Sequence, residues 1–190
     1  MKEAYDLRYT ALEEFENLPE GVRAELIDGE IYYLAAPSTL HQIIVGEVHV
    51  EIRNYIRRNR GKCRVFIAPC DVELSENIVE PDLFVLCDTS KITEKRCVGA
   101  PDWVIEVTSS NAENDYIKKF NLYKNSGVRE YWIIDPDNEY TNVYNFTPDS
   151  NVIGFIRYPF SDTITAGIYK DNPEPLEICV ADLISEFYHG

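Results

Sequence analysis

Two apolar segments decide the fold of this chain: residues 79–86 read VEPDLFVL, and residues 101–108 read PDWVIEVT. Each contains a run of aliphatic and aromatic residues typical of a strand that is buried on both faces. Each also carries a carboxylate that such a strand does not need, because Asp82 opens the first run and Glu106 interrupts the second. An ionised carboxylate is costly to bury without a partner, so we expect a compensating cation. If the two strands are neighbours, a metal ion explains both acids.

An amphipathic segment after the second run predicts a helix that packs back onto these strands. Residues 111–126 follow a polar turn and place apolar side chains at helical spacing. Asp115, Lys119 and Tyr123 are separated by four residues each, so they share one face of this helix. A further buried strand follows at residues 130–135, and the strand–helix–strand order predicts a right-handed crossover. Lys119 is therefore free to aim at the two carboxylates.

Two further candidates lie upstream. Residues 24–34 predict a hairpin with an Asp-Gly turn, and Glu25 sits among apolar residues on its first strand. This glutamate is either an edge-strand charge or a group that supports the acidic site. His41 lies in the first turn of a helix expected over residues 40–59. A histidine at that position is either a surface or capping residue or a functional one.

The end of that helix is strongly basic. Its cations, which form a third of the 18 Lys and Arg residues in the chain, are Arg53, Arg57, Arg58, Arg60, Lys62 and Arg64. One interpretation is a solvated face whose cations interact favourably with the helix C-terminus. The other is a phosphate-binding patch, in which Arg53, Arg57, Arg58 and Arg60 contact nucleic acid. Both interpretations stay open at this point.

Composition bounds the class of protein. A chain of 190 residues with 45% apolar content suits a single domain over residues 1–190. The formal charge of −15 counts against a nucleic-acid partner, because binding to a phosphate backbone is largely electrostatic. Bound divalent cations and a local basic patch can nevertheless reverse the field at one site.

The cysteines and the apolar segments indicate the compartment. Five cysteines without a C-x-x-C pair predict reduced thiols and give no zinc signature. No uncharged apolar run approaches the roughly 18 residues of a spanning helix, and residues 1–6 lack a signal-peptide core. We therefore expect a cytoplasmic protein with no membrane partner.

The C-terminal third predicts more of the same domain. Short alternating runs near residues 142–146, 154–158 and 176–180 predict an antiparallel extension, and residues 181–188 predict a short closing helix. Apolar strand edges and 13 tyrosines favour a two-fold homodimer.

The order of these elements resembles the PD-(D/E)XK nuclease superfamily and, more closely, the restriction-endonuclease-like Uma2 family, also known as DUF820. The motifs that carry the resemblance are ELIDGE at 25–30, His41, the Pro-Asp pairs at 81–82 and 101–102, WVIEVTS at 103–109, Asp115, Lys119, Tyr123 and GVREYW at 127–132. The likeness runs from about residue 9 to 135. It implies an α/β (α+β) fold: a restriction-endonuclease-like core with a mixed central sheet flanked by helices, an N-terminal hairpin and a C-terminal antiparallel extension.

The resemblance also implies an Mg²⁺-dependent (or Mn²⁺-dependent) endonuclease-like hydrolase that cleaves phosphodiester bonds in nucleic acid, above all DNA. Asp82, Glu106 and the backbone carbonyl of Val107 would hold the metal, since carboxylate and carbonyl oxygens suit this hard cation. Lys119 would orient the attacking water or stabilise the transition state.

One position departs from the superfamily pattern. A lysine is expected two residues after the catalytic glutamate, and Thr108 stands there. The resemblance implies that Lys119 of the following helix takes over, with Lys118 as a substitute. Glu25 and His41 would be auxiliary groups that support the site or a second metal.

Two other functions stay open. The first is a catalytically inactive binding or regulatory module of the same fold, which the charge of −15 and Thr108 favour. The second is a hydrolase of small phosphorylated compounds, which would suit an acidic surface.

The metal hypothesis makes a geometric demand. Asp82 and Glu106 must lie on adjacent strands with carboxyl oxygens about 4–6 Å apart. Asp102, which belongs to the second Pro-Asp pair, should lie outside the site. Asp71 either joins the acidic site or caps a turn.

Overall fold

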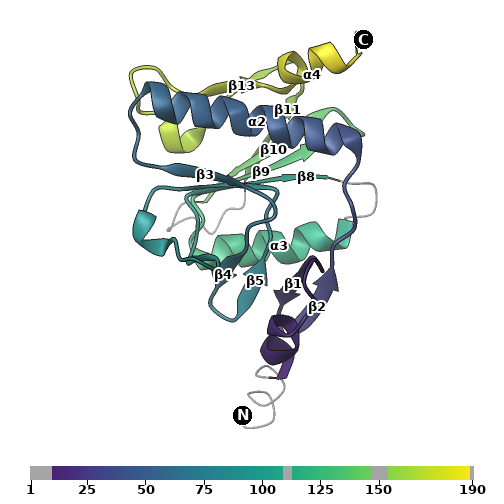
Figure 1. The fold of residues 1–190 in the computed structure, drawn as a ribbon. Helices are drawn as coiled ribbons and strands as arrows, with labels where there is room; N and C mark the ends of the chain where they lie inside the picture. Colours follow the sequence, from purple (N-terminus) through teal and green to yellow (C-terminus); the bar gives the residue numbers. More distant parts are fainter. Residues whose placement is uncertain (1–9, 109–112, 147–153, 189–190) are drawn as a thin grey trace.

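The computed structural model describes residues 10–108, 113–146 and 154–188, and its centre is a six-stranded sheet (Figure 1). In spatial order the strands are β11 (Phe155–Pro159), β10 (Tyr140–Asn145), β9 (Glu130–Asp135), β8 (Trp103–Val107), β6 (Leu83–Leu86) and β3 (Arg64–Ile67). β8 and β9 run parallel, and the other neighbouring pairs of this sheet are antiparallel. This is the mixed sheet that the sequence predicts.

A second, smaller sheet contains the N-terminal hairpin. Its strands in spatial order are β2 (Glu30–Tyr33), β1 (Ala24–Ile27), β5 (Asn77–Val79), β4 (Val72–Leu74) and β7 (Cys97–Val98). Asp28 and Gly29 have φ angles of 53° and 82° and form the predicted tight turn. Because β1 pairs with β5 as well as with β2, Glu25 lies on an interior strand. The interpretation of Glu25 as an edge-strand charge is therefore wrong.

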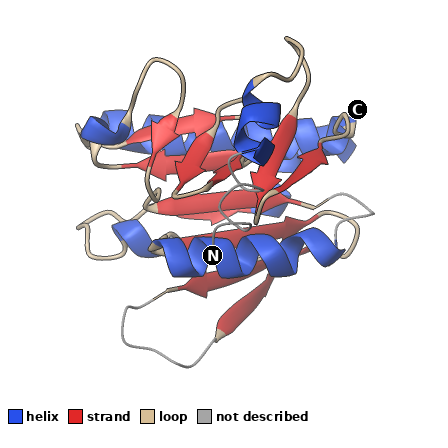
Figure 2. Ribbon diagram, turned by 90° about the horizontal axis from the view of Figure 1, so that it is seen from below, coloured by secondary structure: helices blue, strands red, loops and turns tan. Residues whose placement is uncertain are grey.

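Helices cover both faces of the central sheet. α2 (Thr39–Arg58) lies on one face, and α3 (Glu113–Ser126) lies on the other beside the smaller sheet (Figure 1). Figure 2 views the molecule from the α3 side. α2 begins where the Ser38 side chain accepts a hydrogen bond from the His41 backbone N–H at 3.2 Å. The residues of α2 that form the predicted apolar face are Ile44, Val48, Ile52, Tyr55 and Ile56, and all are buried.

The C-terminal third continues this architecture. β10 and β11 extend the central sheet beyond β9, as the alternating pattern predicts. β12 (Thr163–Thr165) pairs with β13 (Glu177–Cys179), with the short 3-10 helix η2 (Gly167–Tyr169) between them. α4 (Val180–Tyr188) is the predicted closing helix, and Ile184 packs in the same apolar cluster as Ile52 of α2.

Cys63 and Cys87 form a disulfide bond, which corrects the expectation that all five cysteines are reduced. The two residues flank the antiparallel pairing of β3 with β6, in which Arg64 lies opposite Leu86. Cys63 and Cys87 are the next residues outward, so they face each other across the two strands. This pairing depends on strand register and not on local spacing. Cys70, Cys97 and Cys179 are free thiols.

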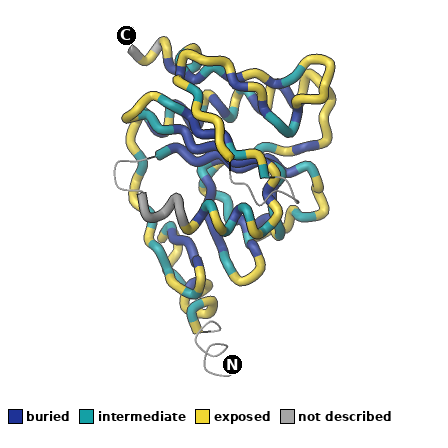
Figure 3. The backbone as a smooth tube through the Cα atoms, turned by 180° about the vertical axis from the view of Figure 1, so that it is seen from behind, coloured by how far each residue is buried: buried dark blue, intermediate teal, exposed yellow. Residues whose placement is uncertain are grey.

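Burial is greatest along the middle strands of the central sheet (Figure 3). Residues 83–86 and 103–107 are buried throughout, because β6 and β8 are covered on both faces. A charged side chain on either strand is thus removed from bulk water and needs partners inside the protein. Within the described residues, no helix combines the length and apolar character needed to cross a membrane.

Candidate active site

Asp82 and Glu106 meet on neighbouring strands. β6 pairs with β8 so that Leu83 lies opposite Ile105, which places Asp82, one residue before β6, opposite Glu106. The Val107 backbone N–H donates to Asp82 Oδ2 at 2.9 Å, and the Asp82 backbone N–H donates to Glu106 Oε2 at 3.4 Å. Each carboxylate thus contacts the backbone of the opposite strand, at the adjacency that the sequence predicts.

α3 brings a lysine and a tyrosine to Glu106. Lys119 Nζ lies 3.1 Å from Glu106 Oε1, and the Tyr123 hydroxyl donates to the same oxygen at 2.8 Å. Lys118 lies on the exposed side of the helix, where its ammonium contacts the Tyr32 hydroxyl. The helix face predicted from the four-residue spacing is therefore correct for Lys119 and Tyr123, while the side chain of Asp115 lies outside the described residues.

Glu25 also contacts Lys119. Its side chain is 1% exposed, its Oε1 lies 2.8 Å from Lys119 Nζ, and it accepts the Glu80 backbone N–H at 2.9 Å. Lys119 is itself only 8% exposed and is held between two carboxylates. The buried ammonium therefore compensates Glu25 and Glu106 together.

His41 contacts the other acid of the pair. Its Nε2 lies 3.0 Å from Asp82 Oδ2, and the ring is buried in the first turn of α2. Its Nδ1 has no hydrogen-bond partner among the described residues. The interpretation of His41 as a surface residue is wrong, because the turn that Ser38 caps aims the ring at Asp82.

Burial and neighbouring charges shift the pKa values of this cluster. Burial raises the pKa of Glu106 to about 7; Asp82 and Glu25 add to the rise, and Lys119 and Tyr123 oppose it. Burial alone would lower the pKa of Lys119, but the Glu106 and Glu25 carboxylates outweigh it and raise that pKa. Burial and the Glu106 carboxylate raise the pKa of the Tyr123 hydroxyl. Lys119 is thus an ammonium, and Tyr123 a protonated donor, at neutral pH.

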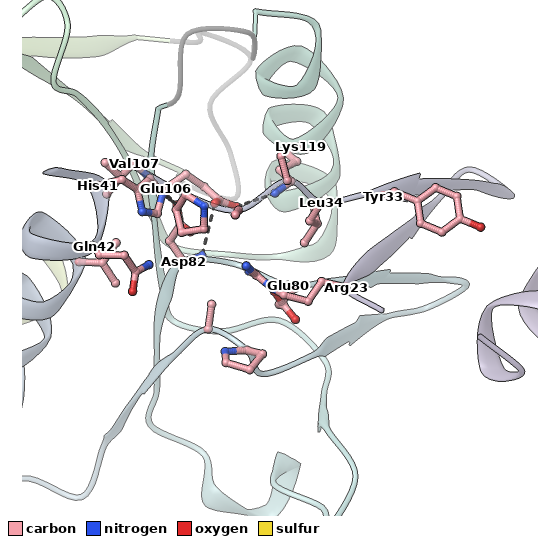
Figure 4. Close-up of a pocket in the computed structure, with 16 residues that line it drawn as sticks. Arg23, Tyr33, Leu34, His41, Gln42, Glu80, Asp82, Glu106, Val107 and Lys119 are labelled. Carbon is pink, nitrogen blue, oxygen red and sulfur yellow. Dashed lines mark hydrogen bonds and ion pairs between the residues drawn. The ribbon is translucent and has the colours of Figure 1, made fainter. Parts of the chain in front are cut away.

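Part of this cluster faces a cavity of about 520 Å³ (Figure 4). Its lining includes the charged residues Arg23, Glu80, Asp82, Glu106 and Lys119, together with His41. Sequence reasoning missed Arg23 and Glu80. Their signal is the two-residue spacing that separates Arg23 from Glu25 and Glu80 from Asp82, since residues two apart on an extended chain face the same side.

Other sequence candidates lie elsewhere. Asp102 accepts the Cys87 backbone N–H at 2.8 Å and pairs with Arg129 at 3.1 Å, outside the cavity as expected. Asp71 does not line the cavity either. The basic residues predicted at the end of α2, namely Arg53, Arg57, Arg58, Arg60, Lys62 and Arg64, are all exposed. At 1.5 Å per residue, Arg58 lies about 25 Å along the helix from His41.

Sequence reasoning also missed Glu130, which is buried at the start of β9. Its carboxylate accepts the Trp132 indole N–H at 2.7 Å and the backbone N–H groups of Gly167 and Ile168 at 2.9 and 2.8 Å. Burial raises the pKa of Glu130, and these donors oppose the shift. It does not line the cavity and anchors η2 to the central sheet.

The comparisons with known proteins agree with this architecture. The family model Uma2, described as "Putative restriction endonuclease", matches residues 12–155. The protein slr1290 of Synechocystis is 24% identical over 144 residues, which cover 74% of each chain. A crystal structure from Anabaena variabilis, described as "a putative nuclease belonging to DUF820", is 23% identical with a TM-score of 0.75. The match covers 92% of this chain and 97% of that one. Its likeness shows the fold. Since the family match spans well over half of its 190 residues, this chain belongs to the Uma2 family of restriction-endonuclease-like proteins.

Proposed function

We propose that this protein is a metal-dependent nuclease that hydrolyses phosphodiester bonds in nucleic acid, and in DNA above all. The observation that carries the proposal is the position of Glu106, which lies beside Asp82 from the neighbouring strand and beside Lys119 from α3. Two carboxylates and an ammonium at one end of a cavity form the donor set that metal-assisted hydrolysis of a phosphodiester requires.

The donor set fits Mg²⁺ or Mn²⁺. The described residues contain no group of three or more His, Cys, Asp and Glu side chains with metal-binding geometry. Mg²⁺ does not need one, because it keeps several waters and binds through one or two carboxylates plus substrate phosphates. Asp82, Glu106 and the carbonyl of Val107 would hold the ion. The Val107 N–H already faces Asp82. The N–H and C=O of one strand residue point toward the same neighbouring strand, so the Val107 carbonyl also faces the side of Asp82. When bound, the ion lowers the pKa of a water and offsets charge on the phosphate.

Lys119 serves as a fixed positive charge. Its raised pKa keeps it protonated at neutral pH, so it does not accept the proton of the attacking water. Its ammonium can donate to that water or to a phosphate oxygen, and it offsets the charge that develops in the transition state. Lys119 thereby supplies from α3 the cation that Thr108 cannot supply from the strand.

Glu25 and His41 position the two central groups. Glu25 pairs with Lys119 alongside Glu106, and His41 Nε2 contacts Asp82 Oδ2. Such supporting contacts fix the orientation of ligating and catalytic groups and affect metal affinity without direct contact.

The position of the basic residues bears on substrate length. Arg53, Arg57, Arg58 and Arg60 are exposed near the C-terminal end of α2, whereas the cavity lies at its N-terminal end. They would contact only a strand that extends well beyond the cavity. The cavity lining has three carboxylates, Glu80, Asp82 and Glu106, and two permanent cations, Arg23 and Lys119, so a bound divalent cation would strengthen the binding of an anionic substrate.

We also propose that residues 1–190 act as one domain that forms a homodimer. Support for one domain comes from the apolar cluster that joins Ile178 and Ile184 to Trp103 of β8. Support for a dimer comes from Phe155 and Ile156, which are exposed on the edge strand β11. Light scattering at micromolar concentration should give twice the monomer mass, and a monomer mass would contradict the dimer.

Cleavage assays test the proposed activity. Purified protein should cut labelled nucleic acid with Mg²⁺ or Mn²⁺ and lose this activity in EDTA. Single- and double-stranded DNA and RNA are tested in parallel, with Asp82→Asn as the control for a contaminating nuclease. A wild-type protein that binds metal yet cleaves none of these substrates would instead support an inactive binding module.

A further inference from the structure

The cavity contains a second permanent cation, Arg23, besides Lys119. The ammonium of Lys119 is buried, and two of its three donors face Glu25 and Glu106. The guanidinium of Arg23 is different: its side chain is 34% exposed, and its partner Glu80 is 6% exposed. Arg23 is therefore the more accessible cation of the described cavity lining.

Glu80 holds the guanidinium of Arg23 by one edge. Arg23 Nε donates to Glu80 Oε1 at 2.7 Å, and one terminal nitrogen donates to the same oxygen. A guanidinium has five N–H donors, so donors of Arg23 are left over after these contacts. Because a buried carboxylate already orders one edge of this guanidinium, its side chain loses little further conformational entropy when an anion binds the other edge.

Glu80 also links Arg23 to the catalytic cluster. The Glu80 backbone N–H donates to Glu25 Oε1, the oxygen that lies 2.8 Å from Lys119. Arg23, Glu80 and Asp82 all line the cavity (Figure 4). Glu80 and Asp82 are two residues apart on an extended segment, so their side chains face the same side. The guanidinium is thus fixed relative to Glu106 and Lys119.

We propose that Arg23 is the phosphate-binding residue of this cavity. Its guanidinium binds the phosphate of the nucleic-acid strand that neighbours the cleaved phosphate. This assignment rests on the proposed nuclease function and adds a substrate contact to it. Arginine matches a phosphate through two parallel N–H···O bonds, whereas lysine offers only a point charge. A carboxylate-rich cavity on a protein of formal charge −15 gains from such a contact, because the rest of its field repels the strand.

The test measures binding apart from cleavage. A fluorescein-labelled single-stranded oligodeoxynucleotide is titrated with Glu106→Gln protein in the absence of divalent metal, and fluorescence anisotropy reports the affinity. Adding Arg23→Gln should weaken binding about 10- to 100-fold, the range for hydrogen bonds to a charged group. The slope of the logarithm of the binding constant against the logarithm of the salt concentration should also become shallower by about 1, which corresponds to the loss of one phosphate contact. The affinity of the Arg23→Lys variant should lie between those of the parent protein and the Arg23→Gln variant.

Arg129 provides a matched control. It also pairs with an acid, Asp102, but lies outside the cavity, so Arg129→Gln should bind like the parent protein. Since Arg23→Gln leaves Glu80 buried without its partner, the double variant Arg23→Gln/Glu80→Gln removes both charges and guards against misfolding. It should bind as weakly as Arg23→Gln. Recovery of affinity in the double variant would overturn the assignment and make repulsion by Glu80 the cause.

The outcomes separate this assignment from the proposed function. If wild-type protein cleaves DNA but Arg23→Gln does not weaken binding of the oligonucleotide, the assignment of Arg23 falls and the nuclease stands. If Arg23→Gln weakens binding but wild-type protein cleaves nothing with Mg²⁺ or Mn²⁺, Arg23 still binds a phosphate, whereas the nuclease function and the placement of that phosphate next to a cleaved one both fall. No binding by the parent protein would also overturn the assignment.

Discussion

Lys119 Nζ lies 3.1 Å from Glu106 Oε1, although the two residues come from different elements, α3 and β8. The superfamily that this chain resembles expects its lysine two residues after the glutamate, on the same strand. Here the helix that follows the strand packs back onto the sheet and brings the ammonium to the same carboxylate. The ammonium thus reaches Glu106 from the following helix and not from the strand.

Asp82 and Glu106 are expected to be the metal ligands. Asp82→Asn or Glu106→Gln should weaken Mn²⁺ binding by more than about 100-fold, beyond the 10- to 100-fold typical of a supporting residue. Isothermal titration calorimetry measures the affinity. Asp102→Asn is the matched control, because Asp102 also follows a proline but contacts Cys87 and Arg129 instead. If Asp102→Asn lost metal binding while Asp82→Asn kept it, the metal ligand would be Asp102 of the second Pro-Asp pair and not Asp82.

His41 is expected to act through Asp82. His41→Ala removes the group that lies 3.0 Å from Asp82 Oδ2, so Asp82 loses a contact that orients it. Mn²⁺ affinity should fall about 10- to 100-fold. Gln42→Ala, which alters the next residue of α2 and also lines the cavity, should leave the affinity unchanged. Equal affinities for wild type and His41→Ala would remove His41 from the site.

The pKa of Glu106 predicts how pH affects the metal-free protein. The folded state holds this proton up to about pH 7, whereas the unfolded state releases it near 4.5. Between these values the folded state binds more protons, so rising pH lowers the free energy of unfolding. The loss is on the order of a few kcal/mol. Urea unfolding in EDTA at pH 5 and pH 8 should show this decline in wild type and a smaller one in Glu106→Gln. Identical pH dependence in both proteins would contradict the shift.

The central residues of the site could be predicted because their signals are local. Asp82 and Glu106 stand out as charges within apolar runs, and Lys119 shares a helix face with Tyr123 through four-residue spacing. The fold class was implied by the resemblance to the Uma2 family, and the periodicities predicted β6, β8, β9, α2 and α3 close to where they form.

The remaining features depend on which distant strands pair. Glu25 is buried because β1 pairs with β5, where Leu26 lies opposite Ile78. The Arg23–Glu80 pair joins residues 57 positions apart for the same reason. The Cys63–Cys87 disulfide likewise depends on the register of β3 with β6. A single sequence read by its local periodicity contains no signal for these pairings.

The most direct test of the account compares Lys119→Met with Lys118→Met in a cleavage assay with Mg²⁺ or Mn²⁺. The two lysines are adjacent on α3, but Lys119 lies between Glu25 and Glu106 while Lys118 is exposed. Lys119→Met should lower the rate at least about 100-fold, as the loss of a transition-state donor does, and leave Mn²⁺ affinity equal or tighter. Lys118→Met should cleave at nearly the wild-type rate. Full activity in Lys119→Met would contradict the proposed mechanism.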